Sequence, residues 1–157
     1  MSPQIGDKAP AFRLHDTEKK LRSLEEFLGR KTVLAFFPGA FTSVCEKELC
    51  TFRDSMARLN ELDAQVVSIC VDAPAPNKAF AAKNNLQFPV LSDYSRNTIR
   101  EYDIVHVGLS GLEGYVSAKR SVFVLDREGK VVYAWVAESQ GREPNYDEIT
   151  AVLASFH

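Results

Sequence analysis

The sequence predicts an α/β domain built on a mixed β-sheet with helices on both of its faces. Short apolar runs rich in β-branched and aromatic residues alternate along the chain with stretches whose apolar residues recur at helical spacing. This alternation is typical of α/β domains. The last two apolar runs are joined only by the turn residues 126–129, which predicts an antiparallel hairpin within the sheet.

Four apolar runs predict the main strands. The first run is bounded by residues that break regular structure and ends at Pro38, and its β-branched and aromatic content indicates a buried strand. A short edge strand is expected near the start of the chain, at 11–14. The four main strands are predicted at 28–38, 65–71, 121–125 and 130–136.

Four stretches predict helices. Ser23 and Glu26 have the spacing of a capping box, which opens a short helix that stops at Gly29. The stretch 93–119 is polar and contains glycine, so it is expected to be irregular with one helical turn. The three longer helices are predicted at 43–60, at 77–84 and from a cap at 145 to near 156.

Length, composition and charge favour one globular domain over residues 1–157. Hydrophobic residues make up 45% of the chain and charged residues 25%. The net charge of -2 provides no basic field for nucleic acid. No apolar run approaches the ~18 residues that a membrane-spanning helix needs. The start of the chain has no signal-peptide pattern, so a cytoplasmic location is expected, with no nucleic-acid or membrane partner.

The three cysteines are Cys45, Cys50 and Cys70. This number is odd and too small for a disulfide scaffold. Cysteines of this kind are more often free, catalytic or metal-bound than structural. Their surroundings are therefore the most informative part of the sequence.

The segment 38–50 joins a buried strand to a helix and carries two of the cysteines. Either Thr42 or Ser43 can cap the helix, and Ser43 with Glu46 has capping-box spacing. Cys45 then lies in the first turn, beside backbone N–H groups that have no helical partner. Such a position favours an anion, here a thiolate.

The helix terminus alone does not explain a fast reaction of this thiol. It stabilises an anion by about 0.3–2 kcal/mol, or at most about 1.5 pKa units. An ordinary thiol is a few per cent ionised at neutral pH, so full ionisation gains only about 30-fold in thiolate. Further donors must stabilise the charge that develops during reaction. The Thr42 hydroxyl, backbone N–H groups of the loop and a guanidinium are the kinds of donor that the sequence offers.

Pro38, Thr42 and Cys45 match the pattern Pro-x-x-x-Thr-x-x-Cys, and with this signature the chain resembles the peroxiredoxins over nearly its whole length. Cys50, five positions after Cys45, resembles the Q-type group, also called bacterioferritin-comigratory-protein-like. The resemblance implies a thioredoxin-like three-layer sandwich. It also implies a thiol-dependent peroxidase that reduces hydrogen peroxide and alkyl hydroperoxides without a metal, haem or flavin.

The same resemblance implies roles for individual residues near the first cysteine. Cys45 is the peroxidatic nucleophile, which becomes a sulfenic acid. Thr42 hydrogen-bonds the peroxide, and Pro38 shields the sulfenic acid from water. Arg120 stabilises the thiolate and the transition state, and Glu48 positions that arginine.

The resemblance further implies that Cys50 is the resolving thiol. It would close an intramolecular disulfide with Cys45, which a thioredoxin-like reductant must open. Q-type relatives are frequently monomers while related groups dimerise, so a monomer or a weak homodimer is expected.

Other interpretations of the cysteines stay open at this point. Cys50 is also compatible with a small apolar core residue, and the protein would then be a one-cysteine peroxidase resolved by an external thiol. A thioredoxin-fold redox sensor or binding module is an alternative from another class. A zinc site from Cys45, Cys50 and a histidine is possible, although no ligand pattern flanks the histidines. Cys70 lies in an alternating buried strand and is expected to be inert packing.

Helix geometry makes a Cys45–Cys50 disulfide demanding. On an ideal helix, α-carbons five residues apart are separated by about 8.6 Å. A disulfide requires less than about 7 Å. The sequence therefore predicts a fully folded reduced state and an oxidised state in which the first turns of this helix are unwound.

Overall fold

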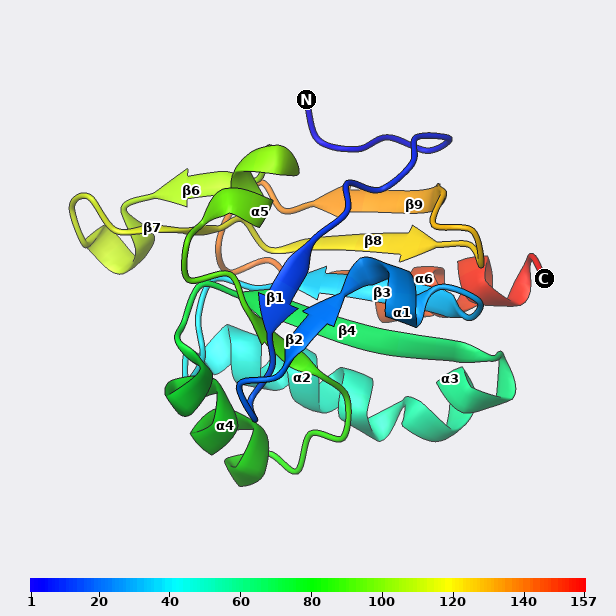
Figure 1. Cartoon of the computed structure of the whole chain (residues 1–157), viewed down its shortest axis with the longest axis horizontal. Coiled ribbons are helices and arrows are strands. Elements are labelled where there is room, and N and C mark those ends of the chain that lie inside the picture. The colour runs from blue at the N-terminus through cyan, green and yellow to red at the C-terminus, as the bar shows by residue number, and fades with distance from the viewer.

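The computed structural model describes residues 1–157 and is organised around a seven-stranded sheet with the order β2-β1-β5-β4-β3-β8-β9 (Figure 1). β3 and β5 run parallel to β4, whereas β8, β9, β1 and β2 are joined to the sheet by antiparallel pairing. The sheet is therefore mixed, as predicted. Its strands are β1 (Arg13–His15), β2 (Leu21–Ser23), β3 (Lys31–Phe36), β4 (Ala64–Cys70), β5 (Val90–Ser92), β8 (Ser121–Leu125) and β9 (Val131–Val136).

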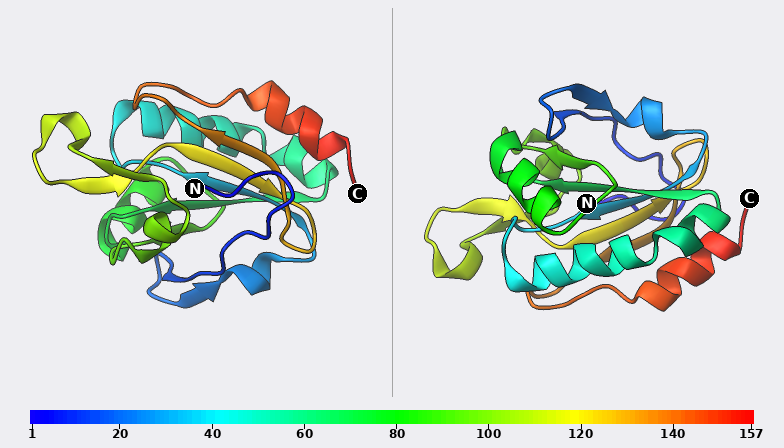
Figure 2. Two further views of the ribbon diagram at one scale, coloured as in Figure 1. Left: turned by 90° about the horizontal axis from the view of Figure 1, so that it is seen from above. Right: turned by 90° about the horizontal axis from the view of Figure 1, so that it is seen from below.

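Helices cover both faces of this sheet. Figure 2 shows α2 and α6 on one side, with β1, β2 and α1 on the other. The first face carries α2 (Ser43–Asp54), α3 (Met56–Glu61), α4 (Pro74–Lys83) and α6 (Tyr146–Ala154). The second face carries the N-terminal segment, α1 (Leu24–Phe27) and α5 (Asn97–Glu101). None of the helices combines the length and apolar character needed to cross a bilayer.

The alternation of side chains along β3 divides the core into two halves. Val33, Ala35 and Phe37 pack with residues of α2, α4 and α6 in one cluster, whereas Leu34 and Phe36 pack with the N-terminal segment and α5 in the other. All of these side chains are fully buried. Because successive side chains of a strand point to opposite faces, a central strand covered on both faces is apolar throughout.

Most predicted elements are confirmed with small shifts in their bounds. The four main strands form as predicted, and the turn at 126–129 joins β8 to β9. Asn145 caps the last helix, with its Oδ1 atom accepting the Glu148 N–H at 3.0 Å. The early strand is shifted to Arg13–His15, and it is not an edge strand, because β2 pairs on its outer side.

Two predicted regions differ from the structure. The helix predicted at 43–60 is divided into α2 and α3 at Ser55, whose hydroxyl donates to the Thr51 carbonyl at 2.9 Å. Serine side chains that bond to the preceding turn often bend helices in this way. The stretch 93–119 contains the predicted helical turn, α5, but is more regular than predicted. It also contains the turn Leu109–Gly111 and a hairpin of β6 (Val105–Val107) and β7 (Val116–Ala118), which projects from the body at the left of Figure 1.

The helix within this stretch has a buried cap. The Asp93 side chain is fully buried and accepts the N–H groups of Thr98 and Ile99 at 3.2 and 2.9 Å. These bonds satisfy donors at the start of α5 that have no partner within the helix. Asp93 lies four residues before the first helical residue, outside the usual capping position, so local spacing did not indicate it.

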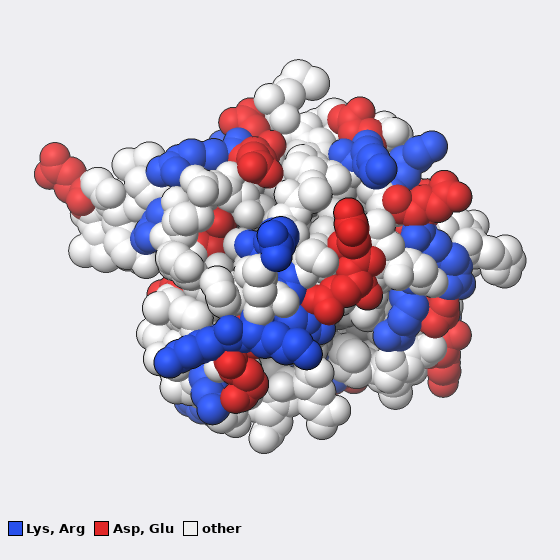
Figure 3. Space-filling model, viewed as in Figure 1, with Lys and Arg blue, Asp and Glu red and all other residues white.

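Charged side chains are distributed without a one-signed field on the face drawn in Figure 3, where positive and negative groups are interspersed. This pattern agrees with the small net charge of -2. A face of mixed sign does not attract polyanions over long distances.

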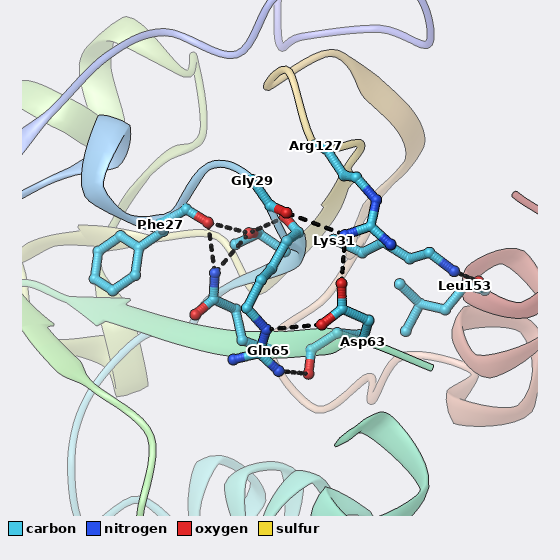
Figure 4. Close-up of polar contacts among 10 residues, drawn as sticks. Phe27, Gly29, Lys31, Asp63, Gln65, Arg127 and Leu153 are labelled. Carbon is cyan, nitrogen blue, oxygen red and sulfur yellow. Dashed lines mark hydrogen bonds and ion pairs between the residues drawn. The ribbon is translucent and has the colours of Figure 1, made fainter. Parts of the chain in front are cut away.

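A network of polar contacts surrounds the first residues of β3, at the opposite end of the strand from Pro38 (Figure 4). Asp63 accepts hydrogen bonds from Arg30 and Arg127, and Arg127 also donates to the Gly29 carbonyl. Lys31 is only 4% exposed, and its Nζ atom donates to the carbonyl of Leu153 at 2.6 Å. This bond satisfies a carbonyl at the C-terminal end of α6 and ties that helix to the central strand.

The Lys31 contact is expected to stabilise the fold measurably. Lys31→Met leaves the Leu153 carbonyl without its partner, so we expect the free energy of unfolding to fall by about 1–3 kcal/mol. Urea unfolding followed by circular dichroism measures this change. Lys130→Met, at an exposed position, is the matched control and should be near neutral. Equal stability of both variants would contradict the assignment.

Candidate active site

Cys45 lies where the loop after β3 enters α2. It is the third residue of that helix, and its side chain is fully buried. The predicted position in the first turn is therefore confirmed. Pro38 lies in the same loop and is buried as well.

Thr42 occupies the N-cap position of α2 but does not cap it with its side chain. Its hydroxyl donates instead to the carbonyl of Gly39 at 2.9 Å, within the loop. The predicted capping box of Ser43 and Glu46 is wrong. Ser43 is the first helical residue, and the Glu46 carboxylate pairs with Lys83 on α4 at 3.2 Å.

Arg120 connects the thiol to a buried carboxylate. Its Nη2 atom donates to the Cys45 sulfur at 3.1 Å, and its Nη1 atom donates to Glu48 Oε1 at 2.7 Å. Nη2 also contacts the Gln140 carbonyl at 3.3 Å. Arg120 is 2% exposed and Glu48 is fully buried, so the structure brings these three predicted residues together out of contact with solvent.

A cavity of about 200 Å³ opens beside this group. Pro38, Thr42 and Arg120 line it from the side of Cys45, and Leu109 and Ser110 line it from the turn that follows β6. The Cys45 sulfur itself is covered. A small molecule in this cavity would thus contact Thr42 and also Arg120, the residue that donates to the Cys45 sulfur.

A family model described as the AhpC/TSA family matches residues 5–134. The chain belongs to this family. Peroxiredoxin Q of Populus jackii, a chloroplast protein, is 35% identical over 151 residues, which cover 96% of this chain and 68% of that protein. Peroxiredoxin Bcp of Bacillus subtilis is 31% identical over 135 residues, with 86% of each chain covered. Among solved structures, peroxidoxin BcpB of Mycobacterium tuberculosis is similar with a TM-score of 0.86 at 30% identity, and 99% of each chain is covered.

These matches confirm the resemblance to peroxiredoxins of the Q or Bcp kind and the thioredoxin-like α/β fold. Peroxiredoxins are peroxidases, so this member of the AhpC/TSA family is a thiol-dependent peroxidase. The thiol that such an activity requires must be one of three, because the chain has three free cysteines.

Burial raises the pKa of the Cys45 thiol, because ionisation would place a charge in a site without water. The Arg120 guanidinium is the strongest influence in the opposite direction, followed by the Thr42 hydroxyl and a backbone N–H group of Gly39. Burial outweighs these donors in the closed site. The sequence predicts that the helix terminus favours the thiolate. That prediction omits the larger effect, desolvation, which favours the neutral thiol.

Glu48 is affected in the same way. Burial and, to a smaller extent, the negative charge of Glu143 together raise its pKa to about 7 against the attraction of Arg120. Burial by itself would lower the pKa of Arg120, but Cys45 and Glu48 raise it, so the guanidinium stays charged. One cation thus faces two acids in the interior. Glu48 Oε2 and Arg120 Nε have no protein partner.

Sequence reasoning missed one residue that supports the loop. The Asp72 carboxylate, after β4, accepts the Ala40 N–H at 2.7 Å and lies against Gly39. It thus fixes the loop whose Gly39 carbonyl accepts the Thr42 hydroxyl. The sequence separation of 32 residues between Asp72 and Ala40 explains the omission, since only the parallel pairing of β3 and β4 brings them together.

The other two cysteines lie outside this group. Cys50 is half-buried on α2, and its sulfur donates to Asn84 Oδ1 at 3.4 Å. Cys70 is fully buried at the end of β4, and burial raises its pKa well above the ordinary range. A thiol that stays protonated and covered is inert, which agrees with the packing role expected for Cys70. No three histidine, cysteine or acidic side chains lie together as a metal-binding group would require.

Glu48 is expected to make stability depend on pH. Its pKa is about 7 in the folded protein against the ordinary 4.5, so the folded state binds a proton that the unfolded chain has released between these values. This contribution to stability is fully present below 4.5 and is lost as pH rises through about 7. We expect Glu48→Gln to gain stability relative to the natural protein, by about 2–3 kcal/mol between about pH 5 and about pH 8.

Urea unfolding of both proteins at the two pH values measures this gain. Glu61→Gln is the matched control, because that side chain is 71% exposed on α3. The control should show no change with pH relative to the natural protein. A gain of the same size in the control, or none in Glu48→Gln, would show that Glu48 is ionised without cost in the folded protein.

Proposed function

We propose that Cys45 is the thiol that reduces hydroperoxides and that Cys50 then resolves the oxidised sulfur. The observation that carries this proposal is the contact of 3.1 Å between Arg120 Nη2 and the Cys45 sulfur, beside a cavity that Thr42 lines. Cys45 is the only one of the three cysteines that lies next to a buried guanidinium. Cys50 and Cys70 donate to neutral asparagine side chains instead.

In the first step the Cys45 thiolate attacks one oxygen of the peroxide. An S–O bond forms as the O–O bond breaks, and the leaving oxygen departs as an alcohol or water after it gains a proton. The sulfur is oxidised to a sulfenic acid and the peroxide is reduced. Negative charge moves from sulfur to the leaving oxygen. Arg120 is in place to stabilise it there, and the Thr42 hydroxyl can donate to it after turning away from the Gly39 carbonyl.

Arg120 is pre-organised for this task. It is held by Glu48 at 2.7 Å and by the Gln140 carbonyl at 3.3 Å, so its position does not change when a peroxide arrives. Donors that are already oriented cost no reorganisation during the reaction. Burial raises the pKa of Cys45, so forming the thiolate in this buried site costs free energy. The fixed guanidinium of Arg120 is needed because it offsets part of that cost.

In the second step the Cys50 thiolate attacks the Cys45 sulfur. A disulfide forms as the S–O bond of the sulfenic acid breaks, and the hydroxyl group leaves as water after it gains the proton that the Cys50 thiol released. A thioredoxin-like dithiol then returns two electrons and restores both thiols. The intact helix across both cysteines supports the expectation that this step requires unwinding, since α2 runs from Ser43 to Asp54.

The proposed assignment is tested by rapid mixing of the reduced protein with hydrogen peroxide, followed by mass spectrometry of the natural protein and of Cys50→Ser. We expect equally rapid oxidation of both, with a Cys45–Cys50 disulfide in the first and a sulfenic acid in the second. Cys45→Ser should not react, and Cys70→Ser is the matched control that should behave like the natural protein.

The same variants discriminate the alternatives. Continued turnover of Cys50→Ser with thioredoxin would favour a one-cysteine peroxidase resolved by an external thiol. Fast single oxidation followed by slow turnover of the natural protein would favour a redox sensor. Oxidation no faster than that of a free thiol would overturn the assignment of Cys45.

Local unwinding is tested by amide hydrogen exchange of the reduced and disulfide forms. We expect protection from Cys45 to Phe52 to be lost on oxidation, because helical α-carbons at this spacing lie about 8.6 Å apart and a disulfide needs less than about 7 Å. Protection of β3 and β4 should not change and serves as the internal control. Identical protection of α2 in both forms would contradict the expectation.

A further inference from the structure

We propose that the C-terminal end of α4 holds α2 in its folded form, with Asn84 as the residue that retains Cys50, and thereby limits the rate at which the disulfide forms. We call Phe80, Lys83 and Asn84 the α4 clasp. Asn84 is a positioning residue in this proposal, since it touches neither peroxide nor the Cys45 sulfur. The inference deepens the proposed function and rests on it for the role of Cys50.

The first contact of the clasp is on the resolving thiol itself. The Cys50 sulfur donates to Asn84 Oδ1 at 3.4 Å, and Asn84 Nδ2 donates to the Phe80 carbonyl at 3.1 Å. The amide is therefore oriented by its own helix, with its oxygen directed at Cys50. To reach Cys45, the Cys50 thiol must leave this acceptor.

Two further contacts hold the same helix. Arg53 donates through Nη1 to the Asn84 carbonyl at 2.6 Å, at the end of α4 where carbonyl groups have no helical partner. Lys83 pairs with Glu46 at 3.2 Å. Glu46, Cys50 and Arg53 are spaced four and three residues apart, so they form one stripe along α2, and this stripe faces the clasp.

The clasp also contacts the loop before α2. Phe41 packs edge-on against Phe80 with ring centroids 5.3 Å apart, and the Lys83 ammonium lies 5.6 Å from the centre of the Phe41 ring. Phe41 has a φ of 63° and is 48% exposed. Such a backbone conformation is costly for a residue other than glycine, so these contacts stabilise a loop that would otherwise relax.

The contacts of Glu46 and Cys50 lie on the segment that must rearrange, and those of Phe41 and Arg53 flank it on either side. Disulfide formation requires unwinding between Cys45 and Cys50, which separates the stripe on α2 from α4. The clasp therefore stabilises the closed form, in which the peroxide reacts, against the open form, in which the disulfide forms. Over-oxidation of the sulfenic acid competes with the second step, so a weaker clasp should also reduce over-oxidation at high peroxide.

The test compares Asn84→Ala and Lys83→Gln with the natural protein. Asn84→Ala removes the acceptor of the Cys50 thiol and leaves the backbone carbonyl that Arg53 contacts. We expect disulfide formation after a single peroxide pulse to become about 3- to 10-fold faster, which corresponds to one neutral hydrogen bond. Lys83→Gln removes a partly exposed ion pair and should give a smaller acceleration. The rate of the first oxidation should not change in either variant.

Amide exchange of the reduced proteins separates the clasp from general destabilisation. We expect faster exchange in Asn84→Ala only between Glu46 and Arg53, whereas a merely structural role would accelerate exchange throughout the core. Asn60→Ala, at an exposed position near the end of α3, is the matched control and should change neither rate. If Asn84→Ala fails to fold, Lys83→Gln is judged by the same two measurements.

Unchanged disulfide formation and unchanged exchange in a folded variant would overturn the proposal. Faster exchange in every part of the core would overturn it as well, because Asn84 would then be only a structural residue. If the natural protein forms no Cys45–Cys50 disulfide, the proposed role of Cys50 fails. In that case amide exchange of the reduced proteins still tests whether the clasp stabilises α2, because this measurement does not depend on the chemistry of Cys50.

Discussion

The candidate active site depends on one buried cation, the guanidinium of Arg120. A charge in the protein interior is costly unless an opposite charge compensates for it, and removal of a partner leaves the remaining charge uncompensated. Two acids face this cation, the Cys45 thiol and the Glu48 carboxyl group. Because one positive charge compensates for one negative charge, ionisation of either acid disfavours ionisation of the other. The reactivity of Cys45 therefore cannot be separated from the protonation of Glu48.

The fold brings this cation to the thiol through the pairing of its central strands. β8 runs antiparallel to β3, and their register places Ser121 opposite Phe36. Arg120, just before β8, consequently lies beside the loop that follows β3. The first turns of α2 then supply both acids from one face, since Cys45 and Glu48 are three residues apart on a helix. A shift of β8 by one residue would turn the guanidinium away from the site.

Elements encoded by neighbouring residues were predictable from the sequence, and those encoded by distant contacts were not. The runs that form β3 and β4, the turn between β8 and β9 and the position of Cys45 follow from local patterns. The bond from Ala40 to Asp72 depends on strand order, which no local pattern contains. The raised pKa of Cys45 depends on how completely other segments cover the sulfur, so the helix terminus alone suggested the wrong direction.

If Cys45 and Cys50 act as proposed, the two chemical steps require different states of α2. A fully buried Cys45 next to a fixed guanidinium suits attack on the peroxide, because an oriented donor stabilises developing charge more strongly where water does not compete with it. The product of that attack is different. The sulfenic acid carries one more oxygen in a site with no exposed surface, and its sulfur no longer offers the charge that Arg120 compensates. In the proposed mechanism, oxidation thus weakens the contact between Arg120 and Cys45 before the helix has to unwind. Oxidation of Cys45 does not alter the contacts between α2 and α4 on the opposite side of the helix, so under our proposal they remain the barrier to disulfide formation by Cys50.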